Sequence, residues 1–305
     1  MAQQTNWPAL DSKACHETVT TLHLCTQVVG KVQLALSPSM AGWAQAPLRL
    51  TPRGLTTQLL WTGDRAMTIR FDLIGHELRF DLSDGAQRTV PLGPRPVAEF
   101  YAGVMAALDA LGVEVTIDPH SVEMAETVSC DTDTTHASYN RACIASLLQA
   151  WTRVGAVFEQ FRSGFRGKQT PVDLWWGTFD LSVARYSGRP ASPPFDRGVI
   201  ERVAMDSEQS LVGFWPGDET SPTPAFFSYT YPKPAGIEAA TVSPEGAVWS
   251  KEAGEFIVPY DVVRGAPDPA RALLDFCESA YAAGAQLAGW DRGLLEREPS
   301  VRRVA

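Results

Sequence analysis

The chain has 305 residues, a formal net charge of −9 and a pI near 5.1, and this acidic balance excludes a general nucleic-acid surface, which needs a concentrated basic face. The hydrophobic content of 45% is ordinary for a globular core, and 24 Gly, 22 Pro and nine Trp indicate many strand ends and turns. We therefore expect a β-rich globular protein that has no RNA or DNA partner.

The N-terminal stretch and the cysteines favour a cytoplasmic location. Residues 1–13 lack a charged start followed by an apolar core, and no apolar stretch approaches ~18 residues, so neither a signal peptide nor a membrane span is expected. The cysteines are scattered, odd in number and without a CxxC pair, so the sequence predicts neither a disulfide framework nor a zinc site. They are Cys15, Cys25, Cys130, Cys143 and Cys277.

The first part of the chain alternates between helical and strand patterns. Helical spacing at 14–28 precedes Gly30-Lys31, and the alternating run at 32–36 is typical of a strand. Residues 67–73 and 77–85 predict a hairpin in which Leu78, Phe80 and Leu82 share one face. Apolar spacing predicts a helix over 96–111, with Pro96 in its first turn and Gly112 as its stop.

The second part repeats this mixture. Apolar residues three or four apart predict a helix over 139–165. Strand alternation at 179–186 places Phe179, Leu181 and Val183 on one face and Asp180, Ser182 and Tyr186 on the other, and a strand at 226–232 groups Phe227, Tyr229 and Tyr231. Asp268 before Pro269 reads as the N-cap of a last helix over 269–288.

Both parts run through the same features in the same order: a helix, a Gly-Lys pair, a Trp-containing strand region, an Arg/Gly corner, a hairpin region and a closing helix. The first part carries Gly30-Lys31 and Trp43, and the second carries Gly167-Lys168 and Trp175-Trp176. We interpret this as a diverged internal duplication: an α+β protein of two related halves with pseudo-twofold symmetry, whose antiparallel sheets are covered by helices. The expected units are 1–118 and 139–305, joined by an acidic connection at 119–138 and packed as one compact body.

Cationic and aromatic side chains near the repeated corners are the main candidates for ligand binding. Cations that converge in a cleft would bind a carboxylate or a phosphate; the candidates are Lys31, Arg53, Lys168, Arg185 and Arg189. Alternatively, each of them is solvated or forms a structural ion pair with Asp72, Asp180 or Glu255. Aromatic residues would line an apolar pocket, or would simply belong to the core; these are Trp43, Trp175, Trp176, Tyr186, Trp215, Tyr229 and Tyr231.

Catalytic equipment is less obvious. Asp180 and Glu208 are candidates for proton transfer, and His76 at a strand corner is a candidate base, although a turn histidine bonded to backbone is the commoner outcome. The five histidines show no metal-binding spacing, so no metal is expected. Gly167-Lys168 does not fit a phosphate-binding loop, because Arg162 occupies the required glycine position.

Seven motifs, in order, resemble an uncharacterised bacterial family, domain-of-unknown-function family 5996. They are TLHLCTQVVGK, RGLTT, DLWWGTFDLSVARYSGRP, GFWPG, FFSYTYPKP, EFIVPYDVVR and WDRGLLE, and the resemblance covers residues 6–296. It implies no activity, cofactor or catalytic residue. Where members of that family tend to have histidine-containing stretches, this chain has AGWAQ at 41–45 and PVDLWWG at 171–177, with Asp173 in the place of a histidine. Any histidine site of those relatives would be altered or lost here.

The function expected from these residues is a cofactor-independent enzyme of the cyclase, lyase, isomerase or hydrolase type. It would hold a small anionic or aromatic metabolite in an aromatic- and arginine-lined cleft between the halves. The alternative is a non-catalytic small-molecule-binding protein of the same architecture, and a third possibility is a protein-interaction surface. A buried carboxylate or histidine with a shifted pKa in the cleft would favour the enzyme.

Overall fold

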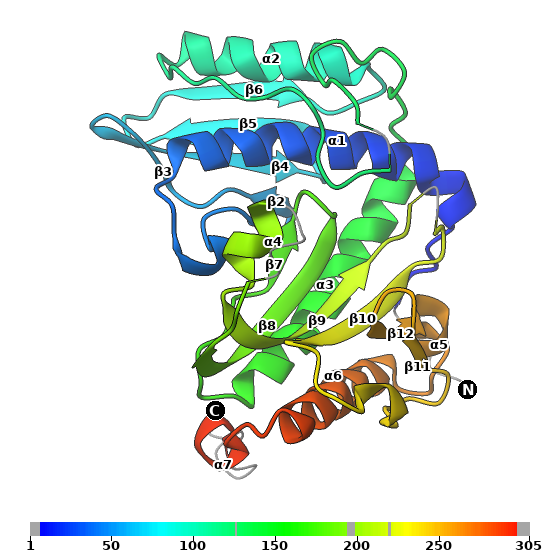
Figure 1. Cartoon of the computed structure of the whole chain (residues 1–305). Helices are drawn as coiled ribbons and strands as arrows, with labels where there is room; N and C mark the ends of the chain where they lie inside the picture. Colours follow the sequence, from blue (N-terminus) through cyan, green and yellow to red (C-terminus); the bar gives the residue numbers. More distant parts are fainter. Residues whose placement is uncertain (1–6, 126, 194–198, 219–220, 298–305) are drawn as a thin grey trace.

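One continuous antiparallel sheet organises the molecule, as the computed structural model shows for residues 7–125, 127–193, 199–218 and 221–297 (Figure 1). The sheet contains 12 strands in the order β11-β12-β10-β9-β8-β7-β1-β2-β4-β5-β6, with β3 paired to β4. The fold class is therefore α+β, as predicted. The strands of the first part are β1 (Leu48–Thr51), β2 (Gly54–Thr56), β3 (Leu60–Thr62), β4 (Arg65–Asp72), β5 (Glu77–Leu82) and β6 (Gln87–Pro91).

The second part of the chain supplies the other strands and joins the first through the β1–β7 pair. Leu48 lies opposite Leu174, and Arg49 lies opposite Asp173, so the main chains of the two parts are hydrogen-bonded into one sheet. These strands are β7 (Asp173–Trp175), β8 (Asp180–Pro190), β9 (Ser207–Trp215), β10 (Ala225–Tyr231), β11 (Val248–Ser250) and β12 (Glu255–Pro259).

Four long helices pack on the sheet, and three of them, α1, α3 and α6, begin after a residue whose side chain accepts a hydrogen bond from the first turn. The Asn140 side chain accepts hydrogen bonds from the first amides of α3, and Asp268 caps α6, which has Pro269 in its first turn. None of the described helices is long and apolar enough to cross a membrane. The helices are α1 (Ser12–Leu36), α2 (Val97–Ala110), α3 (Arg141–Ser163), α4 (Val199–Ala204), α5 (Tyr260–Arg264), α6 (Pro269–Leu287) and α7 (Arg292–Leu295), with short 3₁₀ turns at Ala41–Trp43 and Ile237–Ala239.

The predicted strand at 32–36 is wrong, because α1 continues through Gly30-Lys31 to Leu36. Gly30 does not end the helix. It leaves room for the buried indole of Trp176, which a Cβ at this position would overlap. The two Gly-Lys pairs are therefore not equivalent, since Gly167 and Lys168 lie in the segment between α3 and β7.

The two faces of the C-terminal strands have different neighbours. Leu181, Val183 and Phe214 point into the core, on the face against which α3 and α6 pack, as the alternation predicts. The side chains on the opposite face, including those of Asp180, Ser182 and Tyr186, instead border a large cavity. Phe179 departs from the prediction. It precedes β8 in a left-handed backbone conformation with φ 64° and lines the cavity beside Asp180.

Candidate functional site

A cavity of about 1550 Å³ lies over the open face of the C-terminal strands. Its floor comes from alternate residues of β8, β9, β10 and β12. The first turns of α1 and the connection between the two parts of the chain form other walls, including residues 123–125 and 135–138. The cavity therefore draws on both parts of the chain, and it is large enough for a substantial small molecule.

Much of the floor is apolar and aromatic. Ala184, Tyr186 and Leu211 form a separate small hydrophobic cluster on this face, with Phe227 and Tyr229 packed against it. The same alternate positions of β8 and β9 carry Ser182 and Gln209, so polar groups interrupt the apolar surface. Such a mixture suits a ligand with an apolar body and a few polar groups.

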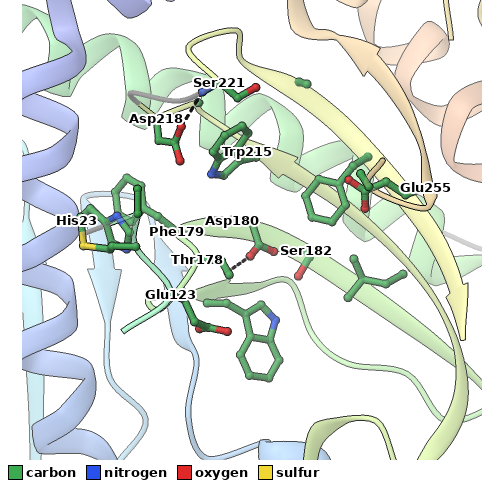
Figure 2. Close-up of a pocket in the computed structure, with 18 of the residues that line it drawn as sticks. His23, Glu123, Thr178, Phe179, Asp180, Ser182, Trp215, Asp218, Ser221 and Glu255 are labelled. Atoms are coloured by element: carbon green, nitrogen blue, oxygen red, sulfur yellow. Dashed lines mark hydrogen bonds between the residues drawn. The ribbon is translucent and has the colours of Figure 1, made fainter. Parts of the chain in front are cut away.

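Asp180 is the buried acid of the cavity. It is 7% exposed, and the Thr178 hydroxyl donates a hydrogen bond to its carboxylate. Burial raises the pKa of Asp180 to about 6, and the hydroxyls of Thr178 and Ser182 offset part of this effect. In Figure 2, Asp180 and Ser182 project from the same strand toward the interior of the pocket. Asp180 follows directly after Phe179, and backbone strain of this kind is concentrated at functional sites.

Glu255, at the start of β12, is the second acid that faces the cavity. Burial raises its pKa to about 7, and the negative charge of Asp180 adds to the rise. No ion pair to Asp180 or to Glu255 occurs within the described parts of the chain. Near neutral pH, each of these carboxyls can therefore both take up and release a proton.

His23 on α1 faces the acids from the helical wall. Its Nε2 lies 3.0 Å from the carbonyl oxygen of Trp176 and 2.9 Å from that of Gly177, so this nitrogen carries the proton and donates. Burial lowers the pKa of His23 to about 4, although both carbonyls raise it. The neutral ring stacks on Phe179 with the centroids 4.8 Å apart. His23 thus supports the strained segment before Asp180.

The raised pKa of Asp180 predicts a pH-dependent cost in stability. The folded protein holds this proton up to about pH 6, against a usual carboxyl value of 3.8, so stability that is present below about pH 4 is lost as the pH rises to 6. The loss amounts to about 3 kcal/mol. We expect urea unfolding to show that Asp180→Asn gains this amount relative to the wild type between pH 4 and pH 7. For the control Asp109→Asn, at an exposed position, the difference in unfolding free energy from the wild type should stay constant with pH. The same constant difference for Asp180→Asn would contradict the raised pKa of Asp180.

Six of the residues singled out in the sequence border the cavity. They are Trp175, Asp180, Tyr186, Trp215, Tyr229 and Tyr231. The Tyr231 hydroxyl donates to the Ser192 carbonyl at 2.6 Å, so this ring is held in place at the end of β10. The structure thus brings the aromatic candidates of four strands together with one of the candidate acids.

The cations singled out in the sequence lie elsewhere. Arg53 pairs with Asp72 at 2.7 Å at the end of β1. Arg189 pairs with Glu208 at 2.7 Å, and neither of these residues lines the cavity. Lys31 donates to the backbone carbonyl of Asp118 at 3.0 Å and to that of His120, where the connection begins. The cavity therefore lacks the arginine lining that the sequence predicted among its described walls.

The remaining candidates are also outside the lining. Arg185 is 1% exposed on the opposite face of the sheet, and Lys168 lies over the ring of Tyr186, 4.9 Å from its centroid. Trp176 donates from its indole to the Ala46 carbonyl at 2.8 Å. Trp43 occupies the short 3₁₀ turn at 41–43 with φ 54°, and His76 lies 3.0 Å from the Tyr139 hydroxyl. These placements leave their proposed binding and catalytic roles as predictions.

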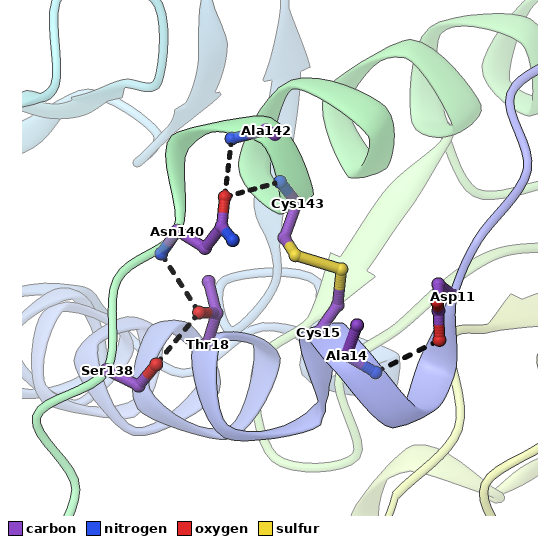
Figure 3. Close-up of a disulfide and its surroundings, with 8 residues drawn as sticks. All are labelled: Asp11, Ala14, Cys15, Thr18, Ser138, Asn140, Ala142 and Cys143. Carbon is purple, nitrogen blue, oxygen red and sulfur yellow. Dashed lines mark hydrogen bonds between the residues drawn. A yellow bond between two sulfur atoms is a disulfide. The ribbon is translucent and has the colours of Figure 1, made fainter.

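A disulfide holds the rim of the cavity (Figure 3). Cys15 in the first turn of α1 is bonded to Cys143 at the start of α3, so the expectation that the cysteines form no disulfide is wrong. The two helix starts are further joined because the backbone amide of Asn140 donates to the Thr18 hydroxyl at 3.0 Å. Residues next to Cys15, including His16 and Glu17, line the cavity. The bond spans 128 positions, which sequence spacing cannot reveal.

Several cavity residues were not predicted. Ser182 was placed on the correct strand face but was not considered a site residue, and the alternation of residues 255–259 could have placed Glu255 on a sheet face. No local signal marks His23, because only tertiary packing brings α1 against the segment between β7 and β8. Within the described ranges, no group of three or more His, Cys, Asp or Glu residues could hold a metal ion.

The model of a family of unknown function, DUF5996, matches residues 7–297. The chain belongs to the DUF5996 family. No curated protein and no solved structure matches it. In this DUF5996 chain Asp173 is 2% exposed and pairs with Arg49 at 2.6 Å outside the cavity lining. Burial still raises the pKa of Asp173 to about 7, since it outweighs the charge of Arg49.

Proposed function

We propose that the protein is an enzyme that acts on a small molecule in the cavity, with Asp180 as its proton-transferring group. One observation carries this proposal: a deeply buried carboxyl borders a large cavity and has a pKa raised to about 6. A group that titrates near the working pH is suited to general acid–base catalysis. Asp180 also directly follows Phe179, whose left-handed backbone conformation is of a kind concentrated at functional sites.

The proposed reaction is a proton transfer that requires no cofactor, such as an isomerisation, a lyase reaction or a hydrolysis. Asp180 would take a proton from the substrate or give one to it, and the Ser182 hydroxyl beside it would orient the reacting group. Aromatic side chains would hold the apolar part of the substrate. The absence of a cofactor is an expectation from the sequence, which contains neither a dinucleotide-binding nor a phosphate-binding motif.

The proposal departs from the earlier expectation of an anionic substrate. Arg53 and Arg189, which were expected to stabilise a developing negative charge, are paired with Asp72 and Glu208 away from the cavity. An aromatic or apolar metabolite is therefore favoured over an anionic one. A protein that binds such a molecule without converting it is the second candidate, because the same cavity would serve it.

The test is turnover of a bacterial metabolite extract, followed by untargeted mass spectrometry. We expect the wild type to consume at least one compound, and Asp180→Asn to slow this reaction by about 10²- to 10⁴-fold, the usual contribution of a general acid or base. Asp109→Asn, at an exposed position of α2, is the control and should react at the wild-type rate.

The outcomes separate the two candidates. Equal turnover by Asp180→Asn and the wild type would overturn the assigned role of Asp180. If no compound is consumed, but native mass spectrometry detects a small molecule that is released on denaturation, the non-catalytic binding protein is the better description. Thermal unfolding of each variant checks that a loss of turnover does not reflect a loss of fold.

The internal duplication is also a proposal. It is supported by the strand order, because β2, β4 and β5 follow β1 outward on one side, as β8, β9 and β10 follow β7 on the other. One part of the sequence correspondence does not agree with the structure: Gly30-Lys31 lies inside α1, whereas Gly167-Lys168 lies between α3 and β7. A cytoplasmic, bacterial location stays a prediction, and the Cys15–Cys143 bond is more typical of an oxidising compartment.

A further inference from the structure

The charged residues around the cavity are strongly unbalanced. Five carboxyl residues line it, against a single lysine and no arginine among the described lining residues; these are Glu17, Glu123, Asp180, Asp218 and Glu255, with Lys233. The lysine has partners of its own, because its Nζ lies 3.8 Å from Glu238 and 5.3 Å from the ring centre of Trp249. Within the described part of the chain, no ion pair to Asp180 or Glu255 therefore offsets the charge of these two acids.

The two acids on the floor differ in how their charge is compensated. Asp180 receives a hydrogen bond from Thr178, and the nearby Ser182 hydroxyl also favours its charged form. For Glu255, burial and the charge of Asp180 both oppose ionisation, and no group of the described chain offsets them. The ionised form of Glu255 therefore has no cationic partner within the described chain. A positively charged group on a ligand would supply this partner.

An unused polar group in the same cavity also points to a ligand. Ser182 is 1% exposed, and its Oγ makes no well-formed hydrogen bond within the described chain, although it lies near enough to the Asp180 carboxylate to favour its charged form. It lines the cavity two residues after Asp180, on the same face of β8. A buried hydroxyl without a partner is unfavourable, and a polar group on a bound molecule would satisfy it.

We infer that the substrate is an organic cation, a protonated amine on an aromatic or apolar body, and that Glu255 binds its ammonium group. The aromatic rings of the floor would contact the apolar body, and their faces favour a nearby positive charge. Glu255, Trp215 and Asp180 all line this cavity (Figure 2), and Asp180 lies near enough to Glu255 for its charge to raise the pKa of Glu255, so one bound molecule can contact these residues. This inference rests on the proposed function, because it names the substrate class of the same cavity.

Three probes that share one indole body and differ in charge test the inference by isothermal titration calorimetry: tryptamine, indole-3-propionamide and indole-3-propionate. We expect tryptamine to bind the wild type at least about tenfold more tightly than the amide, as a charge-assisted hydrogen bond would give, and the carboxylate to bind most weakly. Glu255→Gln should remove this preference for tryptamine and leave the affinity for the amide within about twofold.

Glu252→Gln is the matched control, since Glu252 is exposed in the turn just before β12 and does not line the cavity. It should leave all three affinities unchanged. Equal binding of the three probes, tighter binding of the carboxylate, no detectable binding of any probe, or an unchanged preference in Glu255→Gln would each overturn the inference. These binding results do not depend on turnover. If Asp180→Asn fails to slow a reaction but the wild type still prefers tryptamine, the proposed role of Asp180 fails and the substrate class stands. If Asp180→Asn slows a reaction but tryptamine is not preferred, the substrate class fails and the role of Asp180 stands.

Discussion

Arg185→Ala is expected to lower the free energy of unfolding by about 3–5 kcal/mol, the usual cost of truncating a large buried side chain. The guanidinium is enclosed by aromatic rings, with its carbon 3.3 Å from the ring centre of Phe161 and 4.4 Å from that of Tyr281. It also donates to the Phe161 carbonyl and, at 3.4 Å, to Glu278. Alanine would leave a void and remove these donors. Urea unfolding measures the loss.

Arg185→Met is the matched control, because it keeps most of the volume without the charge. Glu278 is 31% exposed and can regain water in either variant. Because methionine also fills most of the space of the arginine, the methionine variant should lose less stability than the alanine variant. Tryptamine affinity should be unchanged in both, since Arg185 lies on the face of the sheet opposite the cavity. If the variants bound tryptamine more weakly but unfolded at the same free energy as the wild type, Arg185 would instead be a ligand-binding residue, as the sequence predicted.

Gly30→Ala should destabilise the protein by about 1–3 kcal/mol, the usual cost of overpacking a core. Alanine is the better helix former by about 1 kcal/mol, so on an exposed helix the change would stabilise. Here the added methyl group would overlap the indole ring of Trp176, which is 5% exposed and bonded to the Ala46 carbonyl. The ring cannot move aside without losing this bond. Chemical denaturation of the variant measures the net effect.

Gly93→Ala is the comparison for this substitution, because a Cβ at Gly93 meets open space. It should change the free energy of unfolding by less than about 1 kcal/mol. If Gly30→Ala were as stable as the wild type, α1 would not be packed against Trp176 as described, and the continuation of the helix through Gly30 would need another explanation.

Local patterns predicted the secondary structure well wherever they matched the final surroundings of the chain. The helix that begins after Asp268 and the alternation of residues 77–82 were both predicted correctly. The run at 32–36 was not, because apolar residues at alternate positions also occur in a helix that is buried on several sides. Val28, Val29 and Val32 are all buried, so a strand-like composition is tolerated in α1.

The candidate site was harder to predict because its residues come together only in the folded chain. Strand alternation grouped Asp180 with Ser182 and Tyr186, and it grouped the aromatic residues of β10. Asp72 was among the ion-pair partners considered for the cations, but strand alternation could not show that Arg53 pairs with it and Arg189 with Glu208, each 19 positions away. Nor could it show which sheet face the helices leave uncovered, since that depends on long-range packing.

The β1–β7 pair has a consequence for the order in which the protein is made. Residues 48–51 leave the ribosome more than a hundred positions before residues 173–175, which are their partners. Until then, β1 pairs only with β2 and forms an open edge of the sheet, and such edges promote pairing with other chains. A nascent N-terminal part is therefore open to aggregation during synthesis, and this exposure ends when β7 emerges and pairs with β1.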